Sequence, residues 1–283
     1  MNSRSAGFTL AETLVVVLVG ALVMGSIYQM VIMQDRTTRN QFARIETAQN
    51  GRTSLAVITN DLKEISAVDG DIVAAAPTDL TFRALKKAGL TCWKASDTEF
   101  EVWELGDHFA AGDSVLVFSE GNLNSTADDQ WLRAAVTSTT GASGGGCAPD
   151  PYGVGASFTK RLTLSAGMAT ASSGALVRSF THTRYRITDN GEWGQLMRTD
   201  TMAETAIIDR LALTADQGLQ FRYFNAAGAQ IASGSLSSNL NNIMRIQVKV
   251  RGKSASSVSS NGQNRFQDSL VTNVYLRGNY RTQ

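Results

Sequence analysis

The stretch that decides the fold lies near the amino terminus, where residues 7–33 read GFTLAETLVVVLVGALVMGSIYQMVIM. Glu12 is the only charged residue in this stretch, and Asp35 is the next one along the chain. Residues 13–33 therefore form a run of twenty-one residues without a charge. At about 1.5 Å per residue, a helix of this length spans roughly 30 Å, the thickness of the hydrocarbon core of a bilayer. The sequence predicts a membrane-spanning helix over residues 8–33.

Three kinds of segment contain such an apolar run. A secretory signal peptide has an apolar region of about 7–15 residues and a small-residue cleavage site. The run in this chain is longer and ends without an Ala-x-Ala pattern. A plain single-span anchor fits the length but gives no role to Glu12, because a charged side chain costs roughly 2.5–3.5 kcal/mol at the membrane centre on insertion scales.

The third kind of segment accounts for Glu12. A short leader that ends in glycine and is followed by FTLAE at residues 8–12 resembles the signal of type IV prepilins and of type II secretion pseudopilins. The resemblance implies a leader peptide at residues 1–7, cleavage by prepilin peptidase between Gly7 and Phe8, and methylation of the new amino terminus at Phe8. It also implies that Thr9 and Glu12 act in assembly.

The charge of Glu12 has a physical explanation in such an assembly. A carboxylate and an ammonium group are each costly alone in hydrocarbon, and pairing makes them tolerable. We therefore expect Glu12 to meet the amino terminus of a neighbouring subunit, with other pilins as partners through helix bundling. Gly20 and Gly25 also lie in the span. Close helix packing or local loosening of the helix near Gly20 would explain them.

The helix is predicted to continue beyond the membrane as an amphipathic segment at residues 34–67. Apolar or small residues recur there at spacings of three and four, which is typical of a helix with one buried face. The expected buried positions are Phe42, Ile45, Ala48, Leu55, Ile58, Leu62 and Ile65. The Asp69-Gly70-Asp71 cluster and Pro77 then end the pattern.

After Pro77 the apolar pattern alternates with a period of two, which predicts strands and a β-rich head at residues 68–283. Turns are expected between strands, one of them at Gly89, and mobile loops at residues 138–146 and 252–264. The fold class is therefore α+β, a long helix packed on a globular head, as in pilins. The predicted strands cover residues 80–85, 100–105, 114–118, 161–164, 183–187, 195–199, 219–224, 243–250 and 269–276.

The order of the carboxy-terminal segments adds to the resemblance. Segments 184–187, 194–198, 218–224, 243–248 and 271–278 follow Asn60-Asp61-Leu62 at the end of the helix. This order is similar to that of PilW-type minor pilins and the related J-type minor pseudopilins. It implies a minor pilin that primes pilus assembly or lies at the tip, inserted in the inner membrane with its head outside the cytoplasm and later part of the cell-surface pilus. A pseudopilin of type II secretion and a component of a DNA-uptake pilus are the alternatives.

Composition and charge agree with a globular head. The chain has 283 residues, of which 43% are hydrophobic and 18% charged. Residues 1–159 carry 11 Lys/Arg and 18 Asp/Glu, a net charge of −7, whereas residues 160–283 carry 15 and 7, a net charge of +8. Such a split lets neighbouring copies or partners attract one another. The two cysteines, Cys92 and Cys147, lie outside the cytoplasm on this reading, where they form a disulfide or remain free thiols.

The sequence holds no catalytic motif that stands out, so we expect no enzyme, no cofactor and no metal. The phosphate-binding loop and the His-Glu-x-x-His helix are missing from the 283 residues, and GASGG at residues 141–145 matches Gly-x-Ser-x-Gly only within a Ser- and Gly-rich stretch that is predicted to be a loop. His108 and His182 have no ligand spacing, and we expect them on the surface or on strands. Ten acidic residues lie between Asp97 and Asp150. Calcium at Asp128 and Asp129 is conceivable, but a solvated acidic face is favoured.

The carboxy-terminal half is basic, and its cations recur on predicted strands. They can contact nucleic acid or the acidic face of a neighbouring subunit, and the second partner is favoured because aromatic residues among them are few and the acidic half would repel phosphate. These cations are Arg178, Arg184, Arg186, Arg198, Arg222, Arg245, Lys249 and Arg251.

Overall fold

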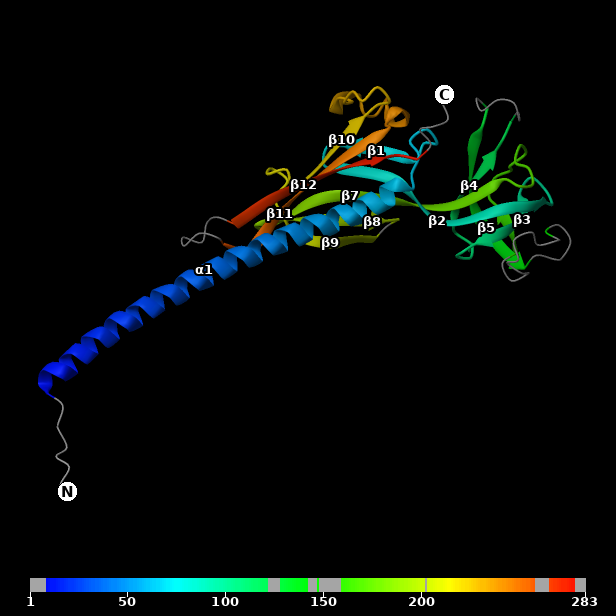
Figure 1. Ribbon diagram of the computed structural model, residues 1–283. Coiled ribbons are helices and arrows are strands. Elements are labelled where there is room, and N and C mark those ends of the chain that lie inside the picture. The colour runs from blue at the N-terminus through cyan, green and yellow to red at the C-terminus, as the bar shows by residue number, and fades with distance from the viewer. Residues whose placement is uncertain are drawn as a thin grey trace, which may run out of the picture.

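The computed structural model describes residues 9–121, 128–141, 147, 159–201, 203–257 and 265–277. A helix of 54 residues, α1 (Leu10–Lys63), projects from a head of antiparallel strands (Figure 1). A long apolar amino-terminal helix followed by a β-rich region is the predicted α+β arrangement. Two short 3-10 helices, Ser233–Ser235 and Leu240–Asn242, lie between the tenth and eleventh strands.

Every predicted strand overlaps an observed one, and three observed strands were not predicted. The unpredicted strands are those at Ile72–Ala76, Gln130–Gly141 and Ala203–Leu211. The strands are β1 (Ile72–Ala76), β2 (Asp79–Lys94), β3 (Glu99–Leu105), β4 (Ser114–Ser119), β5 (Gln130–Gly141), β6 (Thr159–Leu164), β7 (Leu176–Asn190), β8 (Trp193–Asp200), β9 (Ala203–Leu211), β10 (Leu219–Phe224), β11 (Arg245–Ser257) and β12 (Arg265–Tyr275).

Six of the strands close into a ring. Antiparallel pairing runs from β2 to β3, β6, β5, β4 and β7, and β7 pairs with β2 again. Side chains that alternate along β3, β4 and β6 fill the interior, and the residues buried there include Phe100, Val102, Val115, Val117 and Leu162. Closure leaves this barrel without a free sheet edge. We call it the distal lobe.

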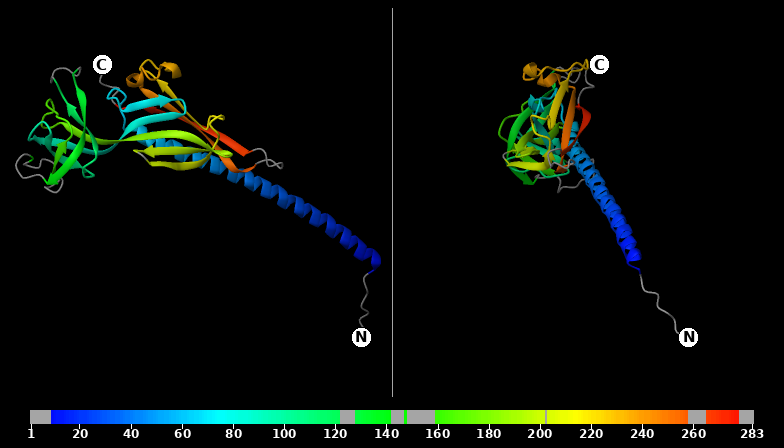
Figure 2. Two further views of the ribbon diagram at one scale, coloured as in Figure 1. Left: turned by 180° about the vertical axis from the view of Figure 1, so that it is seen from behind. Right: turned by 90° about the vertical axis from the view of Figure 1, so that its left-hand side faces the viewer.

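The other lobe, which we call the proximal lobe, is built on α1. Its sheet contains β1, β8 to β12 and the parts of β2 and β7 outside the barrel, and its core includes Ile58 and Leu62 of the helix. The far edge of the sheet, β10, lies near the β1–β2 turn, because the amide of Phe221 donates to the carbonyl oxygen of Pro77 at 2.7 Å. Figure 2 shows the two lobes side by side, with the helix against only one of them.

The two long strands β2 and β7 run through both lobes. Their pairing shifts register between Leu85 and Lys87, and such a bulge bends a pair of strands. The expected turn at Gly89 is wrong, since Gly89 lies inside β2. A Cβ at Gly89 would stand 2.8 Å from the carbonyl oxygen of Trp103, so close strand packing explains the glycine.

The buried face of the outer half of α1 differs from the predicted one. Phe42 and Ile45 are 66% and 51% exposed, so their predicted burial is wrong. Ile58, Leu62 and the following Ile65 are buried as predicted. The helical residues that face the sheet are Ala43, Thr47, Gly51, Ser54, Ile58 and Leu62.

Small side chains on this face let helix and sheet approach closely. A Cβ at Gly252 of β11 would stand 2.6 Å from the carbonyl oxygen of Thr47, and one at Gly51 would stand 3.0 Å from Cδ1 of Leu270. The hydroxyls of Thr47 and Ser54 donate to helix carbonyl oxygens four residues earlier. Burying these two residues therefore leaves neither hydroxyl without a partner.

Both predicted loops are partly strand. Residues 138–141 belong to β5, and residues 252–257 belong to β11. The remaining parts, residues 142–146 and 258–264, lie outside the described residues.

Candidate functional site

The start of α1 is a capping box made by the two residues predicted to act in assembly. Thr9 is the N-cap, and its hydroxyl accepts from the amide of Glu12 at 3.3 Å. The Glu12 carboxylate accepts in return from the amide and the hydroxyl of Thr9, each at 3.0 Å. These bonds satisfy amides that a helix start leaves without partners. Gly7 and Phe8, the predicted processing site, lie outside the described residues.

The inner half of α1 is apolar and uncovered. By length and composition α1 can cross a membrane, and none of its most apolar stretch is buried in the head. The exposed fractions of Leu10, Met24 and Met33 are 83%, 73% and 72%. A Cβ at Gly20 or Gly25 would meet no atom within 4 Å, so packing within this chain does not require either glycine. A surface of this kind needs lipid or other helices to cover it.

A hydrogen bond and an ion pair connect the end of α1 to the proximal sheet. The hydroxyl of Tyr185 on β7 donates to Oδ2 of Asp61 at 2.7 Å, and Nη2 of Arg198 on β8 lies 3.2 Å from the same oxygen. Burial raises the pKa of Tyr185, which keeps its hydroxyl protonated as a donor. The sequence pointed to Asp61 only through the order of segments and gave no role to Tyr185.

A buried ion pair joins the loop after α1 to the boundary between the lobes. Asp71 is fully buried, accepts from the amide of Ser66 at 2.9 Å and lies 3.2 Å from Nη2 of Arg178. The Arg178 guanidinium also lies 3.9 Å from the centre of the Trp131 ring. Burial raises the pKa of Asp71, and the charge of Arg178 opposes that rise. Removing either partner would leave an uncompensated buried charge.

Cys92 on β2 and Cys147 are joined by a disulfide, with a Cα–Cα distance of 5.0 Å. The bond closes a segment that includes β3, β4 and β5, so it constrains the distal lobe.

Two of the acidic residues predicted to form a solvated face are buried in the distal lobe, so the prediction is wrong for them. Glu101 is 1% exposed and accepts from Nη2 of Arg161 at 2.7 Å. Glu104 is fully buried and accepts from the amide of Phe109 at 2.6 Å. Asp107, Glu120 and Asp128 are exposed, as predicted.

The histidines show no metal-binding arrangement among the described residues. Nδ1 of His108 lies 2.5 Å from the Glu104 carboxylate, and the His182 ring packs edge-on against Phe180. Within the described ranges, no three His, Cys, Asp or Glu side chains form a group that could hold a metal ion.

The eight basic residues fall into two groups of four. Arg178, Arg184, Arg186 and Arg198 pair with carboxylates, which are Asp71, Asp79, Glu204 and Asp61 respectively. For Arg222, Arg245, Lys249 and Arg251, no carboxylate oxygen among the described residues lies within ion-pair distance. Sequence alone could not separate the groups, because the pairing acids come from distant segments.

Comparison with protein families finds the Prokaryotic N-terminal methylation motif at residues 2–28. No curated protein matches the chain. No solved structure matches it. Together with the exposed apolar helix, the motif supports a membrane-anchored, type IV pilin-like protein that is processed by prepilin peptidase and assembles with other pilins.

Proposed function

We propose that the chain is a minor pilin of a type IV pilus-like filament, which primes pilus assembly or lies at its tip. The observation that carries the proposal is the contrast along α1. Its inner half exposes an apolar surface, most of which lies within the methylation motif, whereas its outer half is packed on the proximal sheet. The order of the carboxy-terminal strands, similar to that of PilW-type minor pilins, supports the minor role.

Assembly rests on helix bundling. Phe42 and Ile45 are exposed on the outer half of α1, so apolar side chains are exposed again beyond the membrane segment, after the polar residues 34–41. Burying apolar side chains of this size against a neighbouring helix contributes about 1.5–3 kcal/mol each. Neighbouring pilin helices cover this surface in the filament.

Glu12 sets the axial position of each subunit. In the single chain its carboxylate accepts from Thr9, which uses part of a carboxylate's capacity of about four acceptor sites. The remaining capacity and the charge are available to the new amino terminus of a neighbouring subunit. The capping bonds hold the carboxylate at the start of the helix, where that contact is made.

The same features suit a minor pseudopilin of type II secretion, which is the second candidate. Both uses place the chain in the inner membrane with its head outside the cytoplasm, and a pilus subunit then reaches the cell surface. The disulfide between Cys92 and Cys147 supports a head in an oxidising compartment. We propose a structural role without catalysis, cofactor or metal.

Three variants of the capping box separate charge from helix capping. Glu12→Gln keeps an N3 acceptor for the cap but removes the charge, whereas Thr9→Ala weakens the cap and keeps the charge. Glu12→Ala removes both. We expect all three to be cleaved, and we expect incorporation into filaments to fall strongly for both Glu12 variants and weakly for Thr9→Ala. Incorporation is measured by immunoblotting of sheared filaments, and wild-type incorporation of Glu12→Gln would overturn charge pairing.

Processing has a direct test of its own. Mass spectrometry of the mature protein should give an amino terminus at Phe8 that carries a methyl group. Replacing Gly7 by leucine should leave the precursor in the membrane, and normal processing of that variant would contradict the peptidase assignment.

A further inference from the structure

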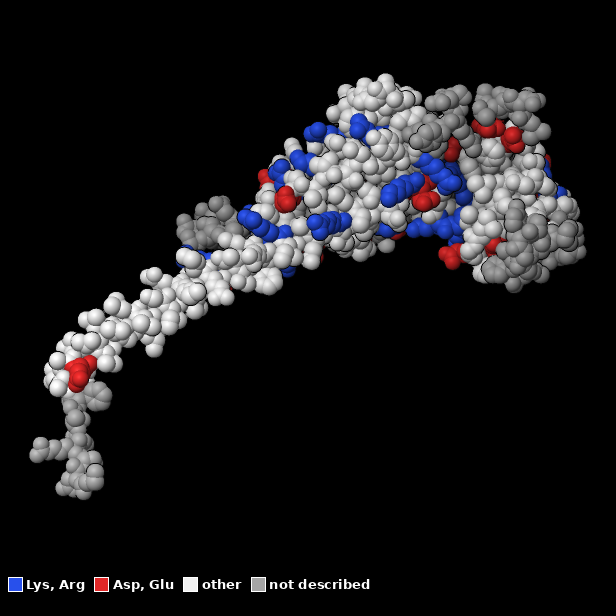
Figure 3. All heavy atoms as spheres, in the orientation of Figure 1, with Lys and Arg blue, Asp and Glu red and all other residues white. Residues whose placement is uncertain are grey.

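The four cations without carboxylate partners lie on one face of the proximal sheet. Arg245, Lys249 and Arg251 alternate along β11, and Arg222 on β10 pairs with Gln247, the position between the first two. Alternating residues share a face of a strand. We call Arg222, Arg245, Lys249 and Arg251 the basic sheet face. In the view of Figure 3, Lys and Arg predominate on the proximal lobe, and Asp and Glu lie mostly on the distal lobe and at the junction.

Neutral groups hold three of these cations in place. Arg251 Nε donates to Oγ of Ser269 at 3.1 Å, Lys249 Nζ to Oε1 of Gln217 at 3.2 Å, and Arg245 Nη1 to Oδ1 of Asn273 at 3.5 Å. Amide and hydroxyl oxygens orient a cation without cancelling its charge. The face therefore keeps a positive potential that an anionic ligand can use.

The cross-strand neighbours of the cations are amides, aromatic rings, a serine and a valine, with no acid among them. Gln247 pairs with Arg222 on one side and with Asn273 on the other. Arg245 stands between Phe224 and Tyr275. Its guanidinium lies 3.9 Å from the centre of the Phe224 ring, and Tyr275 is 70% exposed. A stacked guanidinium beside an exposed tyrosine is a surface on which nucleic-acid bases stack.

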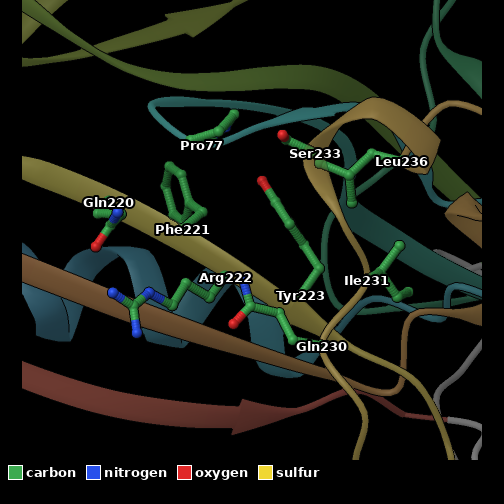
Figure 4. A pocket seen from close by; sticks show the side chains of 9 residues that line it. All are labelled: Pro77, Gln220, Phe221, Arg222, Tyr223, Gln230, Ile231, Ser233 and Leu236. Carbon is green, nitrogen blue, oxygen red and sulfur yellow. The ribbon is translucent and has the colours of Figure 1, made fainter.

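A pocket of about 350 Å³ adjoins the face at β10. Figure 4 shows Arg222 and Gln230 on one side of this strand and Phe221 and Tyr223 on the other. Gln220 also lines the pocket, and its Oε1 is buried without a hydrogen-bond partner among the described residues. The pocket gives a ligand on the basic sheet face room beside Arg222.

The face points away from the helix. Val248, Val250 and Gly252 alternate with the cations on β11 and are buried towards the core and α1. If helices bundle at the filament centre, as in the proposed function on which this step rests, the basic sheet face lies on the outside. A subunit that docks through its helix approaches from the other side.

We propose that the basic sheet face binds single-stranded nucleic acid, with its cations on the phosphates and the Arg245 and Tyr275 row stacking bases. The two objections from sequence are answered by the structure. The exposed acids Asp107, Glu120 and Asp128 of the acidic half belong to the distal lobe. Asp216 and Asp268 are exposed on the proximal lobe but form no ion pair with the four cations, and aromatic rings stand beside Arg245. An acidic protein partner would give no role to the row of Arg245 and Tyr275 or to the amides of Gln247 and Asn273.

The test measures fluorescence anisotropy of a labelled oligothymidylate of about 16 nucleotides, the upper site size of a single-strand binding fold. The purified full chain is used in detergent. We expect saturable binding that is tighter than to a duplex of equal length. We expect affinity to fall as salt rises, with a logarithmic slope of about −0.7 per phosphate contact.

Two double variants of equal charge change decide whether the face is the site. Arg222→Gln with Lys249→Gln should weaken binding about tenfold and reduce the slope by about 1.4, the value for two lost contacts. Arg184→Gln with Arg186→Gln removes two cations that are already paired and should change affinity less than about twofold. Equal losses in the two double variants would overturn the site.

Tyr275→Ala tests the kind of ligand. Loss of one stacking ring should weaken single-strand binding by about fivefold or more and leave duplex binding nearly unchanged. Equal affinity for single strand and duplex, or effective competition by polyglutamate, would overturn the proposal in favour of a duplex or an acidic protein. Binding by purified Glu12→Ala should equal that of the wild type, so failure of assembly and failure of the face are told apart.

Discussion

The two lobes of the head bury the apolar side chains of their strands in different ways. The distal lobe closes six strands on themselves and fills the ring with its own side chains. The proximal lobe leaves its sheet open and takes Ile58 and Leu62 from α1 to complete its core. The stability of the proximal lobe is therefore tied to the helix that enters the membrane, whereas that of the distal lobe is not.

This difference predicts which lobe a given substitution will destabilise. A change in the outer half of α1 affects both the anchor and the proximal core. A change inside the barrel should stay local, apart from effects carried by the shared strands β2 and β7 or by the pair of Asp71 and Arg178. Three experiments test this separation, and a fourth concerns a titratable side chain at the boundary of the lobes.

The largest effect is expected from removing the disulfide, which constrains only the distal lobe. Cys92 and Cys147 are separated by 55 residues, and closing such a loop contributes about 4 kcal/mol in the chain-entropy model. The Cys92→Ser and Cys147→Ser double variant should unfold its barrel at a lower temperature than its proximal lobe, as followed by calorimetry. Hydrogen exchange should rise in β3 and β6 but not in β10. An equal rise in all three strands would mean that the lobes unfold together.

The next effect is expected in the proximal core. Leu62 is fully buried, so Leu62→Ala should lower the free energy of unfolding of the proximal lobe by about 3 kcal/mol, through lost burial and a residual cavity. Urea titration read by intrinsic fluorescence measures the loss. Leu14→Ala is the matched control, because Leu14 is 60% exposed and touches no head core. Faster exchange in the barrel of Leu62→Ala would contradict the separation of the lobes.

A smaller loss is expected where helix and sheet are closest. Gly252→Ala places a methyl group 2.6 Å from the carbonyl oxygen of Thr47, and relieving this overlap should cost about 1–3 kcal/mol. Hydrogen exchange in the outer half of α1 should rise. Gly234→Ala meets no atom within 4 Å and should leave exchange unchanged. Equal behaviour of the two variants would show that the contact tolerates a side chain.

The smallest effect concerns His182 at the boundary of the lobes. Burial lowers the pKa of His182, and the charges of Arg83 and Arg133 lower it further. The unfolded chain therefore binds a proton more readily than the folded chain, so stability is lost as the pH falls below about 6.5, the ordinary histidine pKa. The urea midpoint of the wild type should drop slightly more between pH 7.5 and pH 5 than that of His182→Gln. A ring titration at or above the ordinary pKa, seen by NMR, would contradict this.

Sequence patterns predicted the elements better than their partners. The helix and nine strands follow from length and periodicity, because these signals are local. The buried face of α1 was misplaced since Ala43, Thr47, Gly51 and Ser54 carry little hydrophobic signal. Their regular spacing of three to four residues is the signal that would have found them. The strand β5 was not predicted because its Ser- and Thr-rich end resembles a loop. The strand β9 was not predicted because most of its residues are exposed.

The barrel and the basic sheet face depend on contacts that sequence does not show. Closure of the ring needs β7 to pair with β2 across about 100 residues, and no local pattern reports such a pairing. The basic residues look alike in the sequence, and only the positions of Asp61, Asp71, Asp79 and Glu204 show which cations are neutralised. The amino-terminal motif was readable because its chemistry lies within six consecutive residues.

The capping box has a consequence for maturation. Every group that caps the first turn of α1, namely the amide and hydroxyl of Thr9 and the carboxylate and amide of Glu12, lies after the predicted cut. Excision of residues 1–7 removes none of these hydrogen bonds. The first turn of α1 should therefore be capped in the same way in the precursor and in a subunit ready for polymerisation.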